Sequence, residues 1–120
     1  MSFVVGYVAA GPTANRDLYR RHVEESAAIF KEHGALQFVE CWGVDVPEGT
    51  LTSFPLAVKC HPDETVVFAW IRWESREARA DGMAKVRSDP RMKAMFEGDR
   101  SAPYDMSRMI HGGFEVIVEL

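Results

Sequence analysis

The residues best suited to acid–base chemistry lie in two apolar stretches of the sequence. Glu40 alternates with Phe38 and Trp42, so the carboxyl group and the two rings share one face of a predicted strand. Burial between aromatic rings raises the pKa of a carboxyl group, which makes Glu40 the first candidate for a general acid or base. Arg72, in the apolar stretch Thr65–Trp73, is a candidate for orienting an anionic or carbonyl group. A simpler alternative is an ion pair between Glu40 and Arg72 that helps to fix two subunits together.

Large side chains alternate with small or branched ones along Thr65–Trp73, and both sets are mostly apolar. A strand with two apolar faces is expected inside a sheet that is covered on both sides. We expect the small set to pack under helices, together with Val39 and Cys41. The large set, with Glu40 and Tyr7, is expected to line a pocket on the opposite face. The predicted binding residues are Tyr7, Phe38, Trp42, Phe68, Trp70 and Arg72.

His111 is the second candidate for a catalytic role, and we expect it on the pocket side together with Glu115. The pair Gly112-Gly113 between them indicates a bulge or a close approach of two backbones. Aromatic rings with a few polar groups suit a small, partly apolar ligand. In the alternative, large side chains fill this space themselves and leave a structural or regulatory oligomer without a ligand.

The sequence carries no motif for a metal or a nucleotide cofactor. None of His22, His33 and His61 stands in an HxH or HxxxH spacing. GxSxG, P-loop and GxGxxG patterns are absent too, so we expect no metal and no cofactor. The methionines late in the chain are interpreted as flexible packing. Asp105 and Arg108 are interpreted as a surface ion pair or, alternatively, as a gate at the cavity mouth.

Composition and charge narrow the class of protein. The chain has 120 residues, 47% hydrophobic and 27% charged, and we expect one globular domain over residues 1–120. The net charge of −4 argues against a nucleic-acid binder, which needs a basic patch. We expect no membrane span and no signal peptide, because no apolar run is long enough and the N-terminal one lacks a basic flank. Cys41 and Cys60 then indicate reduced thiols in the cytoplasm.

The predicted order of elements is strand, helix, strand, short strand, strand, helix, strand. Strands are expected over Phe3–Ala10, Ala35–Val46, Phe54–Cys60, Thr65–Trp73 and Met109–Leu120, with a hairpin between the third and fourth. Helices are expected over Arg16–His33 and Arg76–Arg87, with a short helix from Pro90. Asn15 and Ser75 suit N-caps, and Gly34 suits a C-cap. The pattern predicts a ferredoxin-like α+β sandwich, an antiparallel sheet with helices on one face.

Several sequence blocks resemble the YbaA-like family of small bacterial proteins of unknown function. They are CWGVDVPEGTLTSFPLAVK (Cys41–Lys59), VVFAWIRW (Val66–Trp73), SDPRMK (Ser88–Lys93) and RMIHGGFE (Arg108–Glu115). The resemblance spans nearly the whole chain and implies the dimeric α/β-barrel superfamily. There, two ferredoxin-like subunits press their open sheet faces together, so a homodimer is implied. Relatives in that superfamily include cofactor-independent monooxygenases, haem-degrading enzymes and muconolactone isomerase-like proteins.

The resemblance also bears on function. A haem-degrading relative would want an axial histidine on the second long helix, and Arg76–Arg87 contains none. His111 departs from the family pattern, in which an aromatic residue usually precedes the two glycines, so a role for His111 would be peculiar to this chain. The leading hypothesis is a small-molecule-binding protein, with a cofactor-independent oxygenase- or isomerase-type enzyme as its catalytic form. The alternatives are a non-catalytic homodimer and an RNA-associated protein, the latter opposed by the acidic charge.

Overall fold

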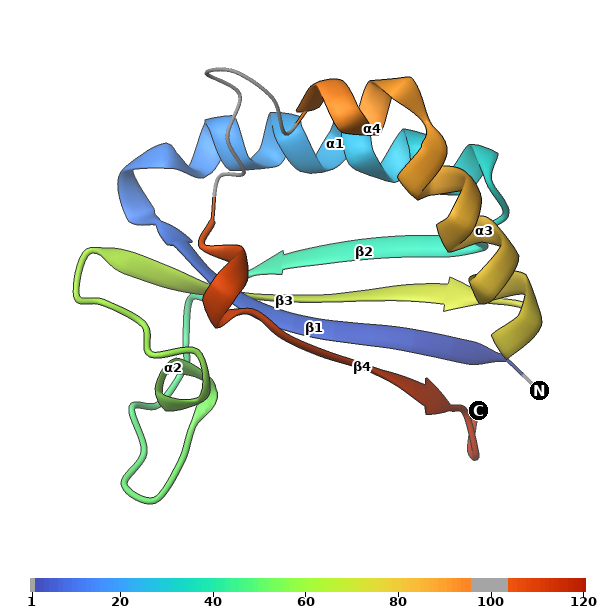
Figure 1. Cartoon of the computed structure of the whole chain (residues 1–120). Helices are drawn as coiled ribbons and strands as arrows, with labels where there is room; N and C mark the ends of the chain where they lie inside the picture. Colours follow the sequence, from blue (N-terminus) through green and yellow to red (C-terminus); the bar gives the residue numbers. More distant parts are fainter. Residues whose placement is uncertain (1, 96–103) are drawn as a thin grey trace.

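The computed structural model describes residues 2–95 and 104–120. Its strands form one antiparallel sheet in the order β2-β3-β1-β4 (Figure 1). They are β1 (Phe3–Pro12), β2 (Gln37–Trp42), β3 (Glu64–Trp73) and β4 (Ile110–Glu115). Helices α1 (Arg16–Glu32), α3 (Arg76–Ser88) and α4 (Pro90–Met95) lie over one face of this sheet. The predicted ferredoxin-like α+β fold is confirmed.

Local sequence signals set the ends of the helices. The Ser75 hydroxyl accepts a hydrogen bond from the Ala78 backbone N–H at 3.0 Å, so Ser75 caps α3 as predicted. Gly34 follows α1 with a φ of +108°, a conformation that glycine adopts without steric cost. Asn15 precedes α1, but its side chain makes no capping hydrogen bond. The predicted bounds of both long helices agree with the structure to within one residue.

The prediction of a strand over Phe54–Cys60 is wrong. This segment contains the short helix α2 (Phe54–Ala57), which is capped by a hydrogen bond from the Leu56 N–H to the Ser53 hydroxyl at 3.1 Å. Pro55 fits the first turn, because N–H groups there have no partner within the helix. The predicted hairpin is therefore wrong as well, and β3 pairs with β1 and β2.

The register of the sheet decides which side chains face the helices. Residues directly opposite each other on antiparallel strands share a face. Tyr7 and Glu40 both lie opposite Ala69, from the two strands that flank β3. Glu40 is hydrogen-bonded to α1, so this is the helix-covered face. The expectation that Val39 and Cys41 pack under the helices is wrong, because they alternate with Glu40 and face the other way.

The paired glycines Gly112-Gly113 of β4 mark neither a bulge nor a close approach of two backbones, but the approach of a side-chain ring. β4 keeps an unbroken register with β1 through both glycines. A Cβ atom on Gly113 would lie 2.4 Å from the Phe3 ring, so only glycine leaves room for that ring. Because the alternation continues, His111 lies opposite Tyr7 on the helix-covered face.

The helix-covered face holds the main core. Trp73 is fully buried and contacts Phe30 of α1, with ring centroids 6.3 Å apart. Gly82 of α3 allows this packing, because a Cβ atom there would lie 2.2 Å from the Trp73 ring. On the opposite face, Val58 from the segment after α2 is buried together with Val8 and covers one end of the sheet. No helix in the described part of the chain is long and apolar enough to cross a membrane.

Candidate functional site

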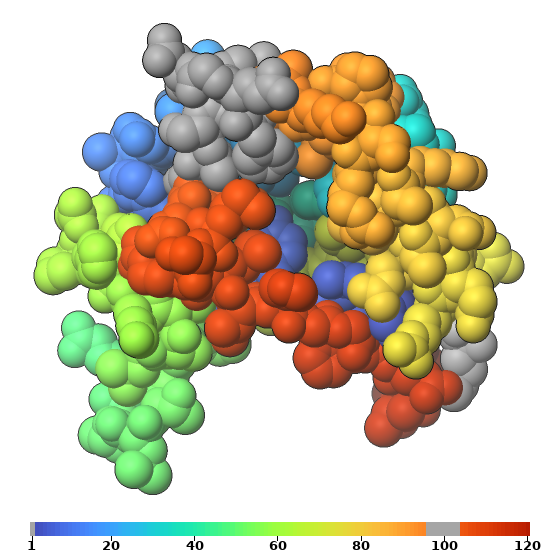
Figure 2. Space-filling model, viewed as in Figure 1, coloured from blue at the N-terminus to red at the C-terminus, as the bar shows by residue number. Residues whose placement is uncertain are grey.

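A cavity of about 610 Å³ opens between the helices and the sheet. Figure 2 shows the hollow between α3–α4 and the segment that runs from residue 104 into β4, with β1 visible inside it. The volume lies within the range of sites that bind small molecules, roughly 300–1,000 Å³. Much of the wall is aliphatic or aromatic, and includes Val5, Phe30, Phe38, Ile71, Trp73 and Val86.

The hydrogen-bonding side chains of the wall come from several elements. Tyr7 lies on β1, His111 lies opposite it on β4, and Tyr104 comes from the segment before β4. His22 and Ser26 lie on α1, four positions apart and therefore on the same side of the helix. The cavity is thus an apolar chamber with a few polar groups, an arrangement that can orient a small molecule.

Glu40 stands at the centre of an aromatic cluster behind this wall. Tyr7 and Tyr19 each donate a hydrogen bond from their hydroxyl groups to the Glu40 carboxylate. The Tyr19 ring contacts Trp42 at a centroid distance of 5.6 Å and Tyr104 at 5.8 Å. One carboxyl group therefore joins β1, β2 and α1 within largely aromatic surroundings.

Burial changes the ionisation of this cluster. Loss of hydration raises the pKa of Glu40, and the hydrogen bonds from Tyr19 and Tyr7 oppose that shift only in part. Burial, and then the nearby Glu40 charge, raise the pKa of Tyr7 and of Tyr19. Both hydroxyl groups therefore stay protonated and act as donors. Glu40 is the member of the cluster best able to accept a proton.

Tyr7 connects Glu40 to the cavity. The Tyr7 side chain is part of the cavity wall, whereas Glu40 lies behind it. A ligand group in contact with the Tyr7 oxygen is thus one hydrogen bond away from Glu40. The geometry can pass a proton from a ligand to Tyr7 while the Tyr7 proton moves to Glu40.

The predicted site residues fall on two faces of the sheet instead of one. The helix-covered face holds Tyr7, Phe38, Glu40, Trp42 and His111. The opposite face holds Phe68, Trp70 and Arg72. The expectation of one pocket lined by all of them is wrong, because Glu40 is in register with Ala69 and so shares the face of the small residues of β3.

The predicted ion pair between Glu40 and Arg72 is also wrong. The two side chains lie on opposite faces of the sheet. Arg72 instead binds the Glu119 carboxylate at 2.6 Å and donates to the Ser2 hydroxyl at 2.9 Å. Arg72 therefore holds the two ends of the described chain beside β3, away from the cavity.

The face opposite the helices carries a group of partly exposed aromatic rings. Phe68 is 41% exposed and Phe114 is 60% exposed. Phe68 contacts Phe54 and Trp70, in each case with ring centroids 5.9 Å apart. Exposed apolar side chains gathered on one surface are typical of a protein–protein contact.

Met83, Met92 and Met109 pack against the core, as interpreted, and together with Met106 they also line the cavity. Met95 packs into the core, as expected. Their crowding late in the chain was a usable signal, because methionine is frequent on adaptable binding surfaces. Tyr19 and Tyr104 had no comparable signal, because no spacing in the sequence links either residue to Glu40.

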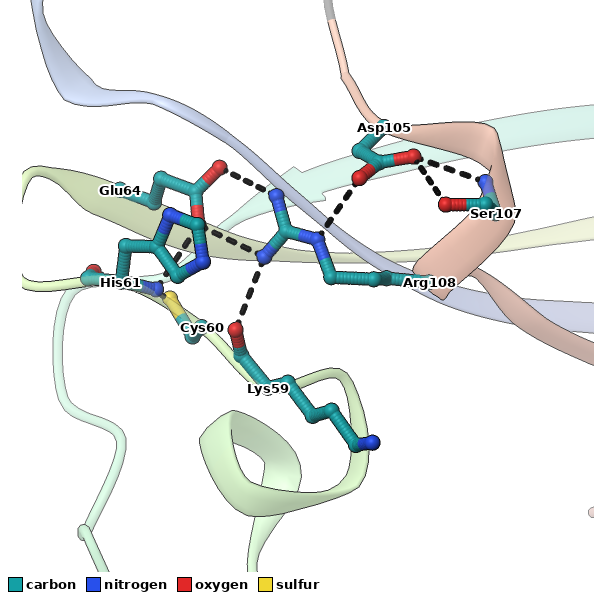
Figure 3. A network of polar contacts seen from close by, with 7 residues as sticks. All are labelled: Lys59, Cys60, His61, Glu64, Asp105, Ser107 and Arg108. Atoms are coloured by element: carbon teal, nitrogen blue, oxygen red, sulfur yellow. Dashed lines mark hydrogen bonds and ion pairs between the residues drawn. The ribbon is translucent and has the colours of Figure 1, made fainter.

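An ion-pair network holds one edge of the cavity. Figure 3 shows the Arg108 guanidinium between Glu64 of β3 and Asp105, at nitrogen–oxygen distances of 2.7 Å and 2.9 Å. Arg108 also donates to the Lys59 backbone carbonyl at 2.8 Å. The predicted pairing of Asp105 with Arg108 is confirmed. Arg108 belongs to the short helix η2 (Met106–Arg108), so the network fastens this part of the cavity wall to the sheet.

The described residues offer no set of side chains arranged as metal ligands. Across residues 2–95 and 104–120, no group of three or more His, Cys, Asp or Glu side chains is arranged to hold a metal ion. Cys41 and Cys60 are both free thiols. The cavity wall includes Tyr7 and His111, whose side chains can exchange protons, and Glu40 lies behind Tyr7.

Comparisons with known proteins give a family match and solved structures of similar fold. The chain matches the family described as "Protein of unknown function (DUF1428)" over residues 2–106. A dimeric ferredoxin-like protein from an uncultured marine organism has a TM-score of 0.64 at 12% identity, with 100% of both chains covered. SnoaB, a cofactor-independent oxygenase from Streptomyces nogalater, has a TM-score of 0.59 at 13% identity, with 98% of this chain and 96% of that chain covered.

Sequence similarity identifies the family of the chain. The uncharacterized protein YbaA of Escherichia coli (strain K12) is 48% identical to it over 119 residues, which cover 99% of each chain. This similarity confirms the resemblance carried by the sequence blocks. The chain therefore belongs to the DUF1428 family and is a relative of YbaA.

Proposed function

We propose that this protein binds a small, largely apolar molecule in the cavity between helices and sheet, and acts on it by proton transfer through Tyr7 and Glu40. The observation that carries this proposal is an apolar cavity wall containing Tyr7, whose hydroxyl is bonded to the half-buried carboxylate of Glu40. Apolar cavities with a few oriented polar groups are the usual form of small-molecule sites. The fold likeness to a cofactor-independent oxygenase supports this class of function by analogy.

The proton would move in one concerted step. A ligand O–H or acidic C–H gives its proton to the Tyr7 oxygen while the Tyr7 proton passes to the Glu40 carboxylate. Tyr7 stays neutral throughout, which agrees with its raised pKa, and the raised pKa of Glu40 improves it as an acceptor near neutral pH. In an isomerase-type reaction, the proton returns to a different ligand atom. In an oxygenase-type reaction, the deprotonated ligand gives electrons to dioxygen.

The active form is a homodimer that packs across the open face of the sheet. Phe68 and Phe114 are exposed on this face and would be covered by a second copy of the chain. The fold neighbour described as a dimeric ferredoxin-like protein supports this arrangement. The free thiols Cys41 and Cys60 fit a reducing compartment, and we place the protein in the cytoplasm.

A second candidate is a non-catalytic homodimer in which Glu40 has a structural role. The observation in its favour is that two tyrosine hydroxyls bind Glu40 and so fasten α1 to β1 and β2. In this case the cavity is a packing defect and the tyrosine–carboxylate cluster only stabilises the fold. RNA association gains no support from a chain with a net charge of −4.

A neutral fluorescent probe, N-phenyl-1-naphthylamine, tests the cavity. The wild-type protein should bind it with saturation and enhanced fluorescence. Met83→Trp enlarges a side chain of the wall and should weaken binding by at least about tenfold. Ala84→Trp, at the neighbouring exposed position of α3, is the matched control and should bind as the wild type does. No saturable binding, or equal losses in both variants, would overturn the proposal.

A chromogenic phenol separates a catalytic role of Glu40 from a structural one. If Glu40 accepts the ligand proton, bound 4-nitrophenol should ionise at lower pH in the wild type than in Glu40→Gln. The absorbance of the phenolate gives the ionised fraction. A purely structural Glu40 predicts the same ionisation of the bound phenol in both proteins, with only the stability of the variant reduced.

A further inference from the structure

We propose that the ligand of this cavity is an organic anion with an apolar body, and that Arg87 and Lys93 hold its charged group. This inference rests on the proposed function of the cavity. Arg87 of α3 and Lys93 of α4 both belong to the wall, and no carboxylate occurs among the wall residues in the described part of the chain. The whole chain has 18 acidic and 14 basic side chains. The described wall residues therefore carry only positive charges, although acidic side chains outnumber basic ones in the chain.

Both cations are available to a ligand. Within residues 2–95 and 104–120, neither Arg87 nor Lys93 makes an ion pair or a side-chain hydrogen bond. Arg91, which lies between them in the sequence, gives the contrast, because it binds Glu32 and Asp89, the latter at 2.8 Å. An anionic ligand group at this part of the wall would accept charge-assisted hydrogen bonds from these cations.

The rest of the wall defines the class of anion. Aromatic, aliphatic and methionine side chains make up most of it, and the cations are exposed groups at its border. A guanidinium group binds carboxylates and sulfonates through two parallel N–H groups. A small, highly charged anion would leave the apolar wall without contacts. The geometry therefore favours a monoanion on a ring system or hydrocarbon chain, such as an aromatic or long-chain carboxylate.

Two probes that differ by one charge test this inference. The fluorescent anion 8-anilino-1-naphthalenesulfonate has the ring system of N-phenyl-1-naphthylamine plus one sulfonate group. Both are titrated into the wild type, into Arg87→Gln/Lys93→Gln, and into the control Arg76→Gln/Lys85→Gln. The control removes the same charge from exposed positions of α3 that are not part of the cavity wall.

The wild type and the control should bind the anionic probe at least about tenfold more tightly than the neutral one, and Arg87→Gln/Lys93→Gln should lose this preference. Neutral-probe affinity should stay the same in all three proteins. Saturable binding of the neutral probe with no preference for the anion would overturn this inference and leave the proposed function intact. A preference lost equally in both double variants would show a general charge effect and would also overturn it. No binding of either probe would overturn both proposals.

Discussion

At the scale of single residues, Glu40 shows how this chain places a carboxyl group under its helices. Two tyrosine hydroxyls donate to it and offset part of the hydration that burial removes. The effect of burial is larger than that of the hydrogen bonds, so the pKa of Glu40 is raised above its ordinary value. Tyr7 and Tyr19 are held in the protonated form by the same burial and by the Glu40 charge. Donor and acceptor roles are therefore fixed by the surroundings of the cluster.

Tyr7→Phe removes one of the hydroxyl groups that favour the charged form of Glu40. The pKa of Glu40 should rise further, and the free energy of unfolding should fall by about 1–2 kcal/mol. NMR titration of the labelled side-chain carboxyl carbon measures the pKa, and urea unfolding measures the stability. Tyr104→Phe is the control, because the Tyr104 ring contacts Tyr19 without a hydrogen bond to Glu40 among the described residues. An unchanged or lower pKa of Glu40 in Tyr7→Phe would contradict this assignment.

The sequence predicted the chemical character of Glu40 but not its side of the sheet. Alternation correctly grouped Glu40 with Phe38 and Trp42, since that grouping needs only the period of a strand. The side they face depends on which residue of β3 lies opposite Glu40, and pairing register is a property of the folded sheet. The tyrosine hydroxyls that make burial of the carboxyl tolerable come from β1 and α1, so local sequence around Glu40 carries no trace of them.

At the scale of elements, two polar networks fix the parts that border the cavity. His33 at the end of α1 contacts the Asp89 carboxylate, which precedes α4, at 2.9 Å. Arg108 of η2 binds Glu64 at the start of β3. Both α4 and η2 supply wall residues, so the shape of the cavity depends on these contacts.

Glu64→Gln tests the second network through its pH dependence. The hydrogen bonds from Arg108 lower the pKa of Glu64 from 4.5 to about 2. Because the folded pKa lies below the unfolded one, this stabilisation is complete above the unfolded pKa and is lost as pH falls toward 2. At pH 7 the variant should be less stable by about 1–2 kcal/mol, after allowance for solvent screening, and the two stabilities should converge near pH 2.

Urea unfolding at a series of pH values measures this difference. Glu24→Gln is the control, because its ion pair with Arg20 lies exposed on α1 and should contribute little at any pH. If the free energies of unfolding of the wild type and Glu64→Gln differ by the same amount from pH 7 to pH 2, the ion pair is not the source of the difference.

The elements themselves were largely predictable, for reasons that are local. Ser75 and Gly34 act at the ends of single helices, and the alternation of β3 needs no partner. Phe54–Cys60 was misassigned because its apolar residues suggested a strand, whereas Ser53 and Pro55 form a helix start. A cap and a proline outweigh apolar composition in a segment this short.

At the scale of the whole molecule, the two faces of the sheet differ in what covers them. Its helix-covered face encloses the cavity, and its open face presents aromatic rings that suit a second copy of the chain. The ferredoxin-like fold was predictable from the order of elements and from the family blocks. The cavity was not, because it forms between side chains of β1, α1, α3, α4 and η2 only when these elements pack together.

Phe114→Asp tests the open face as the dimer interface. Phe114 is 60% exposed, so the change costs the isolated subunit little but places an unpaired charge in the proposed interface. The dissociation constant of the dimer should rise by at least about a hundredfold, as measured by sedimentation velocity over a range of concentrations. Ala80→Asp, at an exposed position of α3, should dimerise as the wild type does. A Phe114→Asp protein that remains as dimeric as the wild type would place the interface elsewhere.

The central claim is that the space between helices and sheet is a ligand site, and the methyl signals of its methionines test it most directly. The protein, labelled with carbon-13 in its methionine methyl groups, is titrated with N-phenyl-1-naphthylamine and followed by NMR. We predict saturable shifts for the wall residues Met83, Met92, Met106 and Met109. Met95, which packs into the core, should change much less. If the probe saturates the protein while the wall methionines stay unshifted, the ligand site lies elsewhere and the claim is contradicted.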